Sequence, residues 1–106
     1  MTRAAADRML AVNCRAWADY VSLPLEEVPR PAMRPRGVRI AIHAAGVSFA
    51  TTLITAGQHQ TKPPLPFTPG TEVAGVVTEC ALGVTRVWPG DRVCAAPEWG
   101  GHAEEV

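Results

Sequence analysis

Apolar and polar residues alternate in two stretches of this chain, residues 21–28 and 38–43, and the alternation predicts β-strands there. It is clearest over residues 38–43, where Val38, Ile40 and Ile42 share one face of a strand. The proline-rich segment 29–36 forbids regular pairing and is expected to be a connector. The expected strands cover residues 9–16, 21–28, 38–43, 72–80 and 91–96.

One segment, residues 49–56, has a pattern that favours a helix. Ser48 before it is a good N-cap residue, and Gly57 after it is a good C-terminal stop. A short helix here would bury one face against the strands. The residues expected on that face, at helical spacing, are Phe49, Leu53 and Ala56.

Two Pro-Gly pairs, Pro69-Gly70 and Pro89-Gly90, each precede an expected strand. They predict type II turns, because proline presets φ at the first position and glycine accepts a positive φ at the second. Many short strands with one brief helix predict a mainly β fold, specifically a small, partly open β-barrel.

Composition and charge exclude several classes of protein. A chain of 106 residues with 47% apolar and 19% charged residues is expected to form one globular domain. It has no apolar run long enough to span a membrane and no secretory leader, so a cytoplasmic location without a membrane partner is expected. The net charge is zero and no basic run is present, so no nucleic-acid partner is expected. A candidate anion-attracting patch remains, formed by Arg30, Arg34, Arg36 and Arg39.

The three cysteines, Cys14, Cys80 and Cys94, are odd in number and have no Cys-x-x-Cys spacing. Neither a disulfide framework nor a four-cysteine zinc site is therefore expected. Each cysteine lies in an apolar, strand-like run, so each is expected to be a small buried hydrophobe.

Polar residues stand at the ends of two expected strands. Ser48 follows one of them, and Thr71 with Glu72 opens the other. If these strand ends meet, their polar side chains line one cleft and form a candidate catalytic half-site. Each residue also has a plainer interpretation: Ser48 as a helix cap, Glu72 as a solvated carboxylate, and His59 as an exposed loop histidine.

Four blocks of sequence resemble the N-terminal, GroES-like catalytic domain of the medium-chain dehydrogenase/reductase superfamily, and within it the quinone oxidoreductase (zeta-crystallin-like) branch. The resemblance covers about residues 9–106 and leaves residues 1–8 as an N-terminal extension. It implies a GroES-like, partly open β-barrel with one short helix. The blocks are His-Ala-Ala-Gly-Val-Ser-Phe at 43–49, Pro-Gly-Thr-Glu-Val-Ala-Gly-Val-Val at 69–77, Pro-Gly-Asp-Arg-Val at 89–93 and Gly-Gly-His-Ala-Glu at 100–104.

The sequence departs from the family pattern at positions that decide whether zinc can bind and which residues form the site. Zinc-dependent members have Cys where Ser48 stands and His where Thr71 stands, so of that ligand set only Glu72 remains. The lobe that holds a structural zinc is also missing. The resemblance therefore implies a zinc-independent protein. The quinone oxidoreductase pattern has Asn, Asp and Tyr at three positions that here are Ser48, Thr51 and His59.

The resemblance implies roles for particular residues in spite of these departures. Ser48 and His59 are the catalytic candidates, since a hydroxyl can bond a reacting group and an imidazole can donate or carry a proton. The implied cofactor-binding residues are Ser48, Phe49 and Thr51. The implied substrate cleft contains His59, Phe67, Thr71 and Glu72, although Phe49 and Phe67 are of a type that is more often core than substrate wall.

The implied activity is hydride transfer from NADPH to a quinone or α,β-unsaturated carbonyl. The family binds its cofactor in a C-terminal dinucleotide-binding domain, and this chain has no Gly-x-Gly-x-x-Gly sequence. We therefore expect the isolated chain to be inactive, as a truncation, and the full-length form to be a homodimer acting on a small-molecule substrate.

Two other interpretations stay open at this point. One is that the barrel stands alone as a GroES-like binding or assembly module without enzymatic activity, although prolines stiffen its longest loop, residues 58–68. The other is that the chain is a non-functional remnant. The residues leave open the substrate, the choice between NADPH and NADH, and the proton donor.

Overall fold

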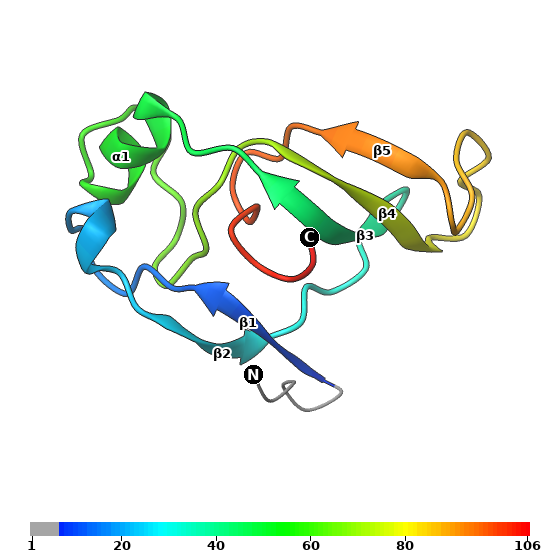
Figure 1. Ribbon diagram of the computed structural model, residues 1–106, viewed down its shortest axis with the longest axis horizontal. Coiled ribbons are helices and arrows are strands. Elements are labelled where there is room, and N and C mark those ends of the chain that lie inside the picture. Colours follow the sequence, from blue (N-terminus) through cyan, green and yellow to red (C-terminus); the bar gives the residue numbers. More distant parts are fainter. Residues whose placement is uncertain (1–6) are drawn as a thin grey trace.

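The computed structural model describes residues 7–106, and within them the chain forms two antiparallel sheets and one α-helix (Figure 1). The first sheet pairs β1 (Arg8–Val12) with β2 (Leu25–Pro29). The second has the order β3–β4–β5 and consists of β3 (Val38–Ala45), β4 (Val73–Cys80) and β5 (Arg92–Ala95). The helical elements are the 3-10 turn η1 (Tyr20–Ser22) and helix α1 (Phe49–Thr55).

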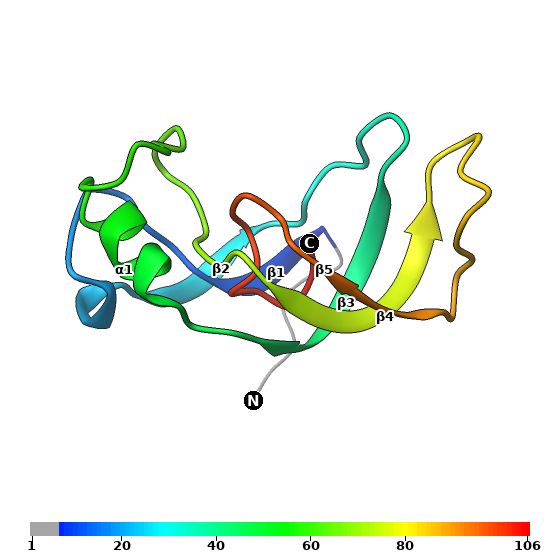
Figure 2. The same cartoon turned by 90° about the horizontal axis from the view of Figure 1, so that it is seen from above.

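The last residues of the chain join the two sheets. The backbone of residues 102–106 bonds Leu10 and Val12 of β1 on one side and Ile40 and Ile42 of β3 on the other, with N···O distances of 2.8–3.1 Å. Figure 1 shows this terminal segment between the sheets, and Figure 2 shows the strong curvature of β3 and β4. The predicted mainly β architecture with one short helix is confirmed.

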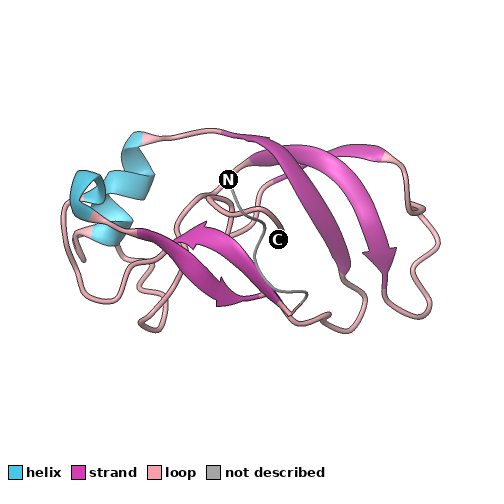
Figure 3. Cartoon of the chain, turned by 60° about the horizontal axis from the view of Figure 1, so that its bottom comes forward, coloured by secondary structure: helices cyan, strands magenta, loops and turns pink. Residues whose placement is uncertain are grey.

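A hydrophobic cluster of the core lies where α1 meets the segments after β1 and before β4. Cys14, Ile54 and Phe67 form a buried cluster, against which Leu23 and Trp99 pack. Burying an apolar side chain of this size stabilises a fold by about 1.5–3 kcal/mol. The turn η1 contacts α1, so both helical elements occupy the same end of the molecule (Figure 3).

The predicted strands in the second sheet are confirmed, whereas both predictions for the first sheet were too long. β1 ends at Val12: Asn13 N still donates to Pro24 O at 2.9 Å in the same register, but proline has no N–H with which to continue the ladder. Val21, predicted to begin the second strand, lies in η1 and is 93% exposed. The backbone N–H groups of Ser22 and Leu23 close that turn.

The helix prediction is confirmed, but the predicted buried face was wrong. Phe49 is 77% exposed, and the buried residues of α1 are Thr51, Ile54 and Thr55. The Thr55 hydroxyl donates to Thr52 O at 3.3 Å, so burying it leaves no orphaned donor. Both faces have helical spacing, and contact with Cys14 and Phe67 selected the one that carries the threonines.

The cysteine prediction holds for one residue and fails for another. Cys14 is buried, Cys80 is half-buried and Cys94 is exposed. Cys94 points outward because residues in β5 alternate between faces, and Val93 and Ala95 take the less exposed positions.

The predicted extension, residues 1–8, lies outside the described residues except for Asp7 and Arg8. Arg8 begins β1, and Asp7 O accepts a hydrogen bond from Arg30 N at 3.1 Å. Across residues 7–106, no helix has the length and apolar character needed to cross a membrane.

Candidate functional site

The two strand ends that carry the predicted polar residues do meet. Ala45 at the end of β3 pairs with Val73 at the start of β4, and Gly46 N donates to Glu72 O at 3.2 Å. The Glu72 side chain lies directly against Gly46 and occupies the space that any side chain at that position would need. Glu72 is exposed, so the carboxylate stands at the surface of this junction.

Ser48 caps helix α1 just beyond this junction. Its Oγ accepts a hydrogen bond from Thr51 N at 3.3 Å and lies 3.2 Å from Thr51 Oγ1. Thr51 is fully buried, so its hydroxyl could influence a ligand only through Ser48, which is half-buried. Beside them, Phe49 presents its ring to solvent.

His59 lies in the loop after α1 and is held by its own neighbours. Its Nδ1 accepts a hydrogen bond from Thr61 N at 2.9 Å, and Lys62 Nζ donates to its carbonyl at 2.8 Å. An acceptor at Nδ1 assigns the proton of the neutral ring to Nε2. The half-buried ring can therefore act as a hydrogen-bond donor through Nε2.

Phe67, predicted as either cleft wall or core, is a core residue. It is 5% exposed, its backbone exchanges two hydrogen bonds with Cys14, and its ring centroid lies 6.1 Å from that of Trp17. Burial raises the pKa of the Cys14 thiol, which suits an inert, packed cysteine.

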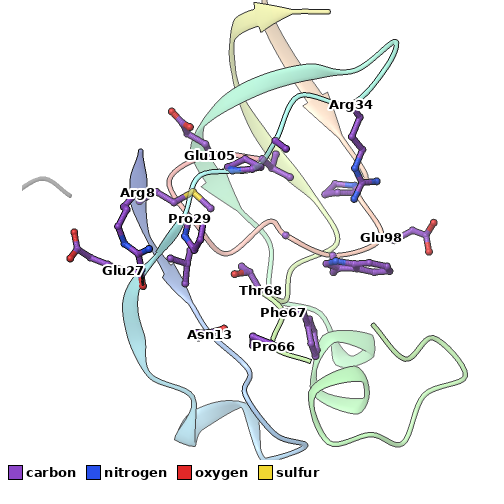
Figure 4. Close-up of a pocket in the computed structure, with 18 of the residues that line it drawn as sticks. Arg8, Asn13, Glu27, Pro29, Arg34, Pro66, Phe67, Thr68, Glu98 and Glu105 are labelled. Atoms are coloured by element: carbon purple, nitrogen blue, oxygen red, sulfur yellow. Dashed lines mark hydrogen bonds between the residues drawn. The ribbon is translucent and has the colours of Figure 1, made fainter. Parts of the chain in front are cut away.

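A large open groove lies elsewhere on the molecule (Figure 4). It has a volume of about 1050 Å³ and runs between β2, the connector after it and the loop 97–100. Of the predicted site residues only Phe67 lines it, and Figure 4 shows Phe67 beside α1 with Arg34 and Glu98 at the far rim. Three arginines and three glutamates line the groove, so its charge selects no single class of ligand.

The predicted patch of four arginines does not form as four accessible cations. Arg30 and Arg39 both pair with Glu105, and Arg39 also pairs with Glu79. Hydrogen bonding to Glu105 raises the pKa of Arg30. Arg34 is the member that lines the groove.

Ser48, Thr71 and Glu72 are the residues from which the sequence resemblance implied zinc independence. Ser48 and Thr71 carry hydroxyls and Glu72 carries a carboxylate, whereas catalytic zinc takes three thiolate, imidazole or carboxylate ligands. Among residues 7–106, no three His, Cys, Asp or Glu side chains are grouped so that they could hold a metal ion.

One polar cluster near the junction was not predicted from the sequence. His102 packs edge-on against the Tyr20 ring, with centroids 5.5 Å apart. It also contacts Tyr20 Oη and Gly46 O, each at 2.8 Å. Nothing in the local sequence points to this cluster, since Tyr20 and His102 are far apart along the chain.

Comparison with known proteins places this arrangement in a family. Residues 34–106 match the family described as the alcohol dehydrogenase GroES-like domain. The chain belongs to that family. It is thereby part of the medium-chain dehydrogenase/reductase superfamily, and the fold and family expected from the four sequence blocks are confirmed.

Its relatives include oxidoreductases of the quinone oxidoreductase group. The chain is 46% identical over 84 residues to rat (Rattus norvegicus) quinone oxidoreductase-like protein 2, and 42% identical over 79 residues to rat quinone oxidoreductase. These alignments cover 78% and 74% of this chain. The chain spans only 24% of the length of each of these curated relatives.

Two solved structures show the same fold. A probable oxidoreductase from Mycobacterium abscessus superposes with a TM-score of 0.85 at 38% identity, covering 93% of this chain and 31% of that one. The quinone oxidoreductase from Coxiella burnetii superposes with a TM-score of 0.85 at 26% identity, covering 93% of this chain and 34% of that one. This chain is therefore a GroES-like domain of the kind found in quinone oxidoreductase-like enzymes.

Proposed function

We propose that this chain is the catalytic-domain portion of a zinc-independent oxidoreductase that transfers hydride from NADPH to a quinone or an α,β-unsaturated carbonyl. The observation that carries the proposal is the junction of β3 and β4, which brings Ser48 and Glu72 to neighbouring strand ends in a chain that is 46% identical to a quinone oxidoreductase-like protein.

The surface around Ser48 supports this assignment. Val47 and Phe49, on either side of Ser48, are 66% and 77% exposed. Exposed apolar residues around a polar group are typical of a surface that a ligand or another domain covers. Reduced nicotinamide would supply the hydride, so the residues of this chain need only bind, orient and shield the reactants.

His59 is proposed to stabilise the oxygen anion that forms when hydride adds to the substrate. Because Nδ1 accepts a hydrogen bond from Thr61 N, the ring offers Nε2–H as a donor to that oxygen. A neutral imidazole does not readily release this proton, so we infer that the proton completing the quinol or ketone comes from water. Glu72 would lie at the cleft as a carboxylate without a metal.

The activity is proposed for a longer protein rather than for this chain by itself. The curated relatives are about four times as long, and NADPH would be held mainly by a dinucleotide-binding domain outside residues 1–106. For the whole protein we propose a cytoplasmic homodimer that acts on a small molecule, without nucleic-acid or membrane partners.

The test is to express the complete product of the gene and follow NADPH consumption with 9,10-phenanthrenequinone and with an enone. We expect turnover that survives incubation with a zinc chelator, and neither turnover nor tight NADPH binding by residues 1–106 alone. A gene that encodes no dinucleotide-binding domain after Val106 would sink the proposal. A heptamer in size-exclusion chromatography would instead favour a stand-alone assembly module.

The proposed contact of Ser48 with the cofactor is tested with a variant that loses the hydroxyl but still caps the helix. Glycine caps a helix nearly as well as serine but has no hydroxyl, so Ser48→Gly should keep the fold within a few tenths of a kcal/mol. We expect it to lower kcat/KM for NADPH by about tenfold, the cost of roughly one hydrogen bond. Ser48→Asn should restore most of the loss, whereas Thr85→Ala on the exposed β4–β5 loop should change nothing.

A further inference from the structure

The His102 side chain connects three segments that are far apart in the sequence. Its Nε2 lies 2.8 Å from Gly46 O, at the end of β3, and its Nδ1 lies 2.8 Å from Tyr20 Oη, in η1. A carbonyl oxygen can only accept, so Nε2 must carry the proton and donate it to Gly46. Nδ1 is then the acceptor, and the Tyr20 hydroxyl donates to it.

The environment of Tyr20 favours this direction of hydrogen bonding. Burial raises the pKa of Tyr20, so the phenol keeps the proton that it donates. The Tyr20 and His102 rings also meet edge-on, at an interplanar angle of 87°. This edge-to-face geometry is a preferred aromatic arrangement and holds the imidazole in its plane.

The backbone of His102 is hydrogen-bonded through both its N–H and its carbonyl group. His102 N donates to Pro69 O at 2.8 Å, and His102 O accepts from Val12 N at 2.9 Å. These bonds attach the residue to the loop before β4 and to β1. The imidazole therefore projects from a rigid base towards the end of β3.

Both polar backbone groups of Gly46 have partners near the candidate site. Its carbonyl accepts from His102, and its N–H donates to Glu72 O at 3.2 Å. Gly46 is separated from the helix cap Ser48 only by Val47, which is 66% exposed and so adds little packing of its own. The orientation of the Gly46 peptide thus sets the direction in which the chain approaches Ser48.

We propose that His102 is a positioning residue, which fixes the Gly46 peptide and so holds Ser48 and Glu72 in their relative placement. The inference rests on the proposed function in one respect, namely that Ser48 contacts the cofactor. The hydrogen-bonded arrangement itself can be tested without any cofactor or substrate.

Two substitutions separate the hydrogen bonds of His102 from its packing. His102→Phe keeps a ring against Tyr20 but loses both hydrogen bonds, whereas His102→Gln loses the ring but keeps one donor and one acceptor. Tyr20→Phe removes only the hydroxyl. His43→Phe is the matched control, because His43 is exposed on β3.

The first measurement is amide hydrogen exchange, residue by residue, on the chain of 106 residues. For His102→Phe we expect exchange to rise by about tenfold at Gly46 and Thr51, whose N–H groups bond Glu72 O and Ser48 Oγ, and to stay unchanged at Val77 and Gly90 in the distant β4–β5 region. His102→Gln should restore most of the protection, and His43→Phe should match the unsubstituted chain.

A uniform rise at all four amides would mean that His102 only stabilises the fold, and it would overturn the proposal, as would no change at Gly46. If His102→Phe does not fold, Tyr20→Phe decides instead: a selective rise at Gly46 supports the proposal, and a uniform rise or none overturns it.

The second measurement is steady-state kinetics of the complete gene product. We expect His102→Phe to lower kcat/KM for NADPH by about tenfold and His102→Gln to recover it. Selective exchange at Gly46 with unchanged kinetics would overturn the positioning role. If the unsubstituted protein does not consume NADPH, the proposed function fails, and the exchange data still decide whether His102 fixes Gly46.

Discussion

The two turns share the Pro-Gly dipeptide and a positive φ at its glycine, yet one is buried and the other is exposed. The predicted positive φ is found at both glycines, 113° at Gly70 and 98° at Gly90. At Gly90, an added Cβ would meet nothing within 4 Å, whereas at Gly70 it would lie 2.6 Å from His102 N. Gly70 is buried and Gly90 is exposed.

The hydrogen bonds of the two turns explain the difference. The Pro89-Gly90 turn closes on itself, since Asp91 N donates to Trp88 O at 3.0 Å. Around Pro69-Gly70, the carbonyls of residues 68–70 accept hydrogen bonds from the N–H groups of residues 100–102, at 2.7–3.0 Å. One turn is a local reversal, and the other is a crossing point of two distant segments.

The comparison shows that one dipeptide can serve two purposes. At Pro89-Gly90 the turn leads the chain into β5 and back alongside β4, where Gly90 N donates to Val77 O at 2.8 Å. At Pro69-Gly70 it brings the start of β4 against the segment that carries His102, and so contributes to the candidate site. We expect matched substitutions in the two turns to lower the free energy of unfolding by different amounts.

The largest effect is expected for Gly70→Ala. A side chain in this backbone conformation costs about 1–3 kcal/mol, and the methyl group would also have to displace the backbone of residues 101 and 102. We expect the free energy of unfolding to fall by more than about 4 kcal/mol, enough to unfold a marginally stable domain. Urea unfolding followed by circular dichroism measures it, and a loss equal to that of Gly90→Ala would contradict the comparison.

A smaller loss of unfolding free energy is expected when either proline is replaced by alanine. Pro69 is fully buried, so Pro69→Ala leaves a small cavity and should lower the free energy of unfolding by about 2 kcal/mol. Pro89 is exposed, so Pro89→Ala should lose only the entropic benefit of the ring, about 0.4–1 kcal/mol. The same urea titration compares Pro69→Ala with Pro89→Ala. Equal losses of unfolding free energy would show that the contact between residues 68–70 and 100–102 adds no stability to the Pro69-Gly70 turn.

Gly90→Ala should cost about 1–2 kcal/mol, because only the backbone conformation opposes the methyl group. The loss should be confined to the β4–β5 turn. Amide exchange should therefore increase at Gly90 and Asp91 and remain unchanged at residues 100–102. An increase at both places would mean that the two turns are coupled.

The smallest effect is expected for Asp91→Ala. Asp91 Oδ2 accepts a hydrogen bond from Trp88 N at 2.9 Å, within the exposed turn. Losing this solvent-exposed bond should cost about 0.5 kcal/mol, and Asp91→Asn should retain most of it, since an amide oxygen also accepts. Thermal unfolding of both variants measures the difference, and a larger loss in Asp91→Asn than in Asp91→Ala would refute the assignment.

Local patterns determined much of this fold in advance. Alternating residues predicted β3, the two Pro-Gly pairs predicted that β4 and β5 follow them, Ser48 predicted the start of the helix, and both glycines of the pairs predicted a positive φ. The meeting of β3 and β4 was a condition of the half-site hypothesis, and the structure supplies it through the pairing of Ala45 with Val73. These features depend on φ, ψ and hydrogen bonds between near neighbours, which the residue types themselves restrict.

Contacts between distant segments decided the rest. They selected the threonine face of α1 over that of Phe49, left Cys94 exposed, and placed the large groove away from Ser48 and Glu72. They also joined His102 to Tyr20 and Gly46. A sequence pattern can state that a helix has two possible faces or that a histidine has two nitrogens. Which face is buried and which atoms each nitrogen meets depend on how the two sheets close around the last residues of the chain, and only the tertiary structure contains that information.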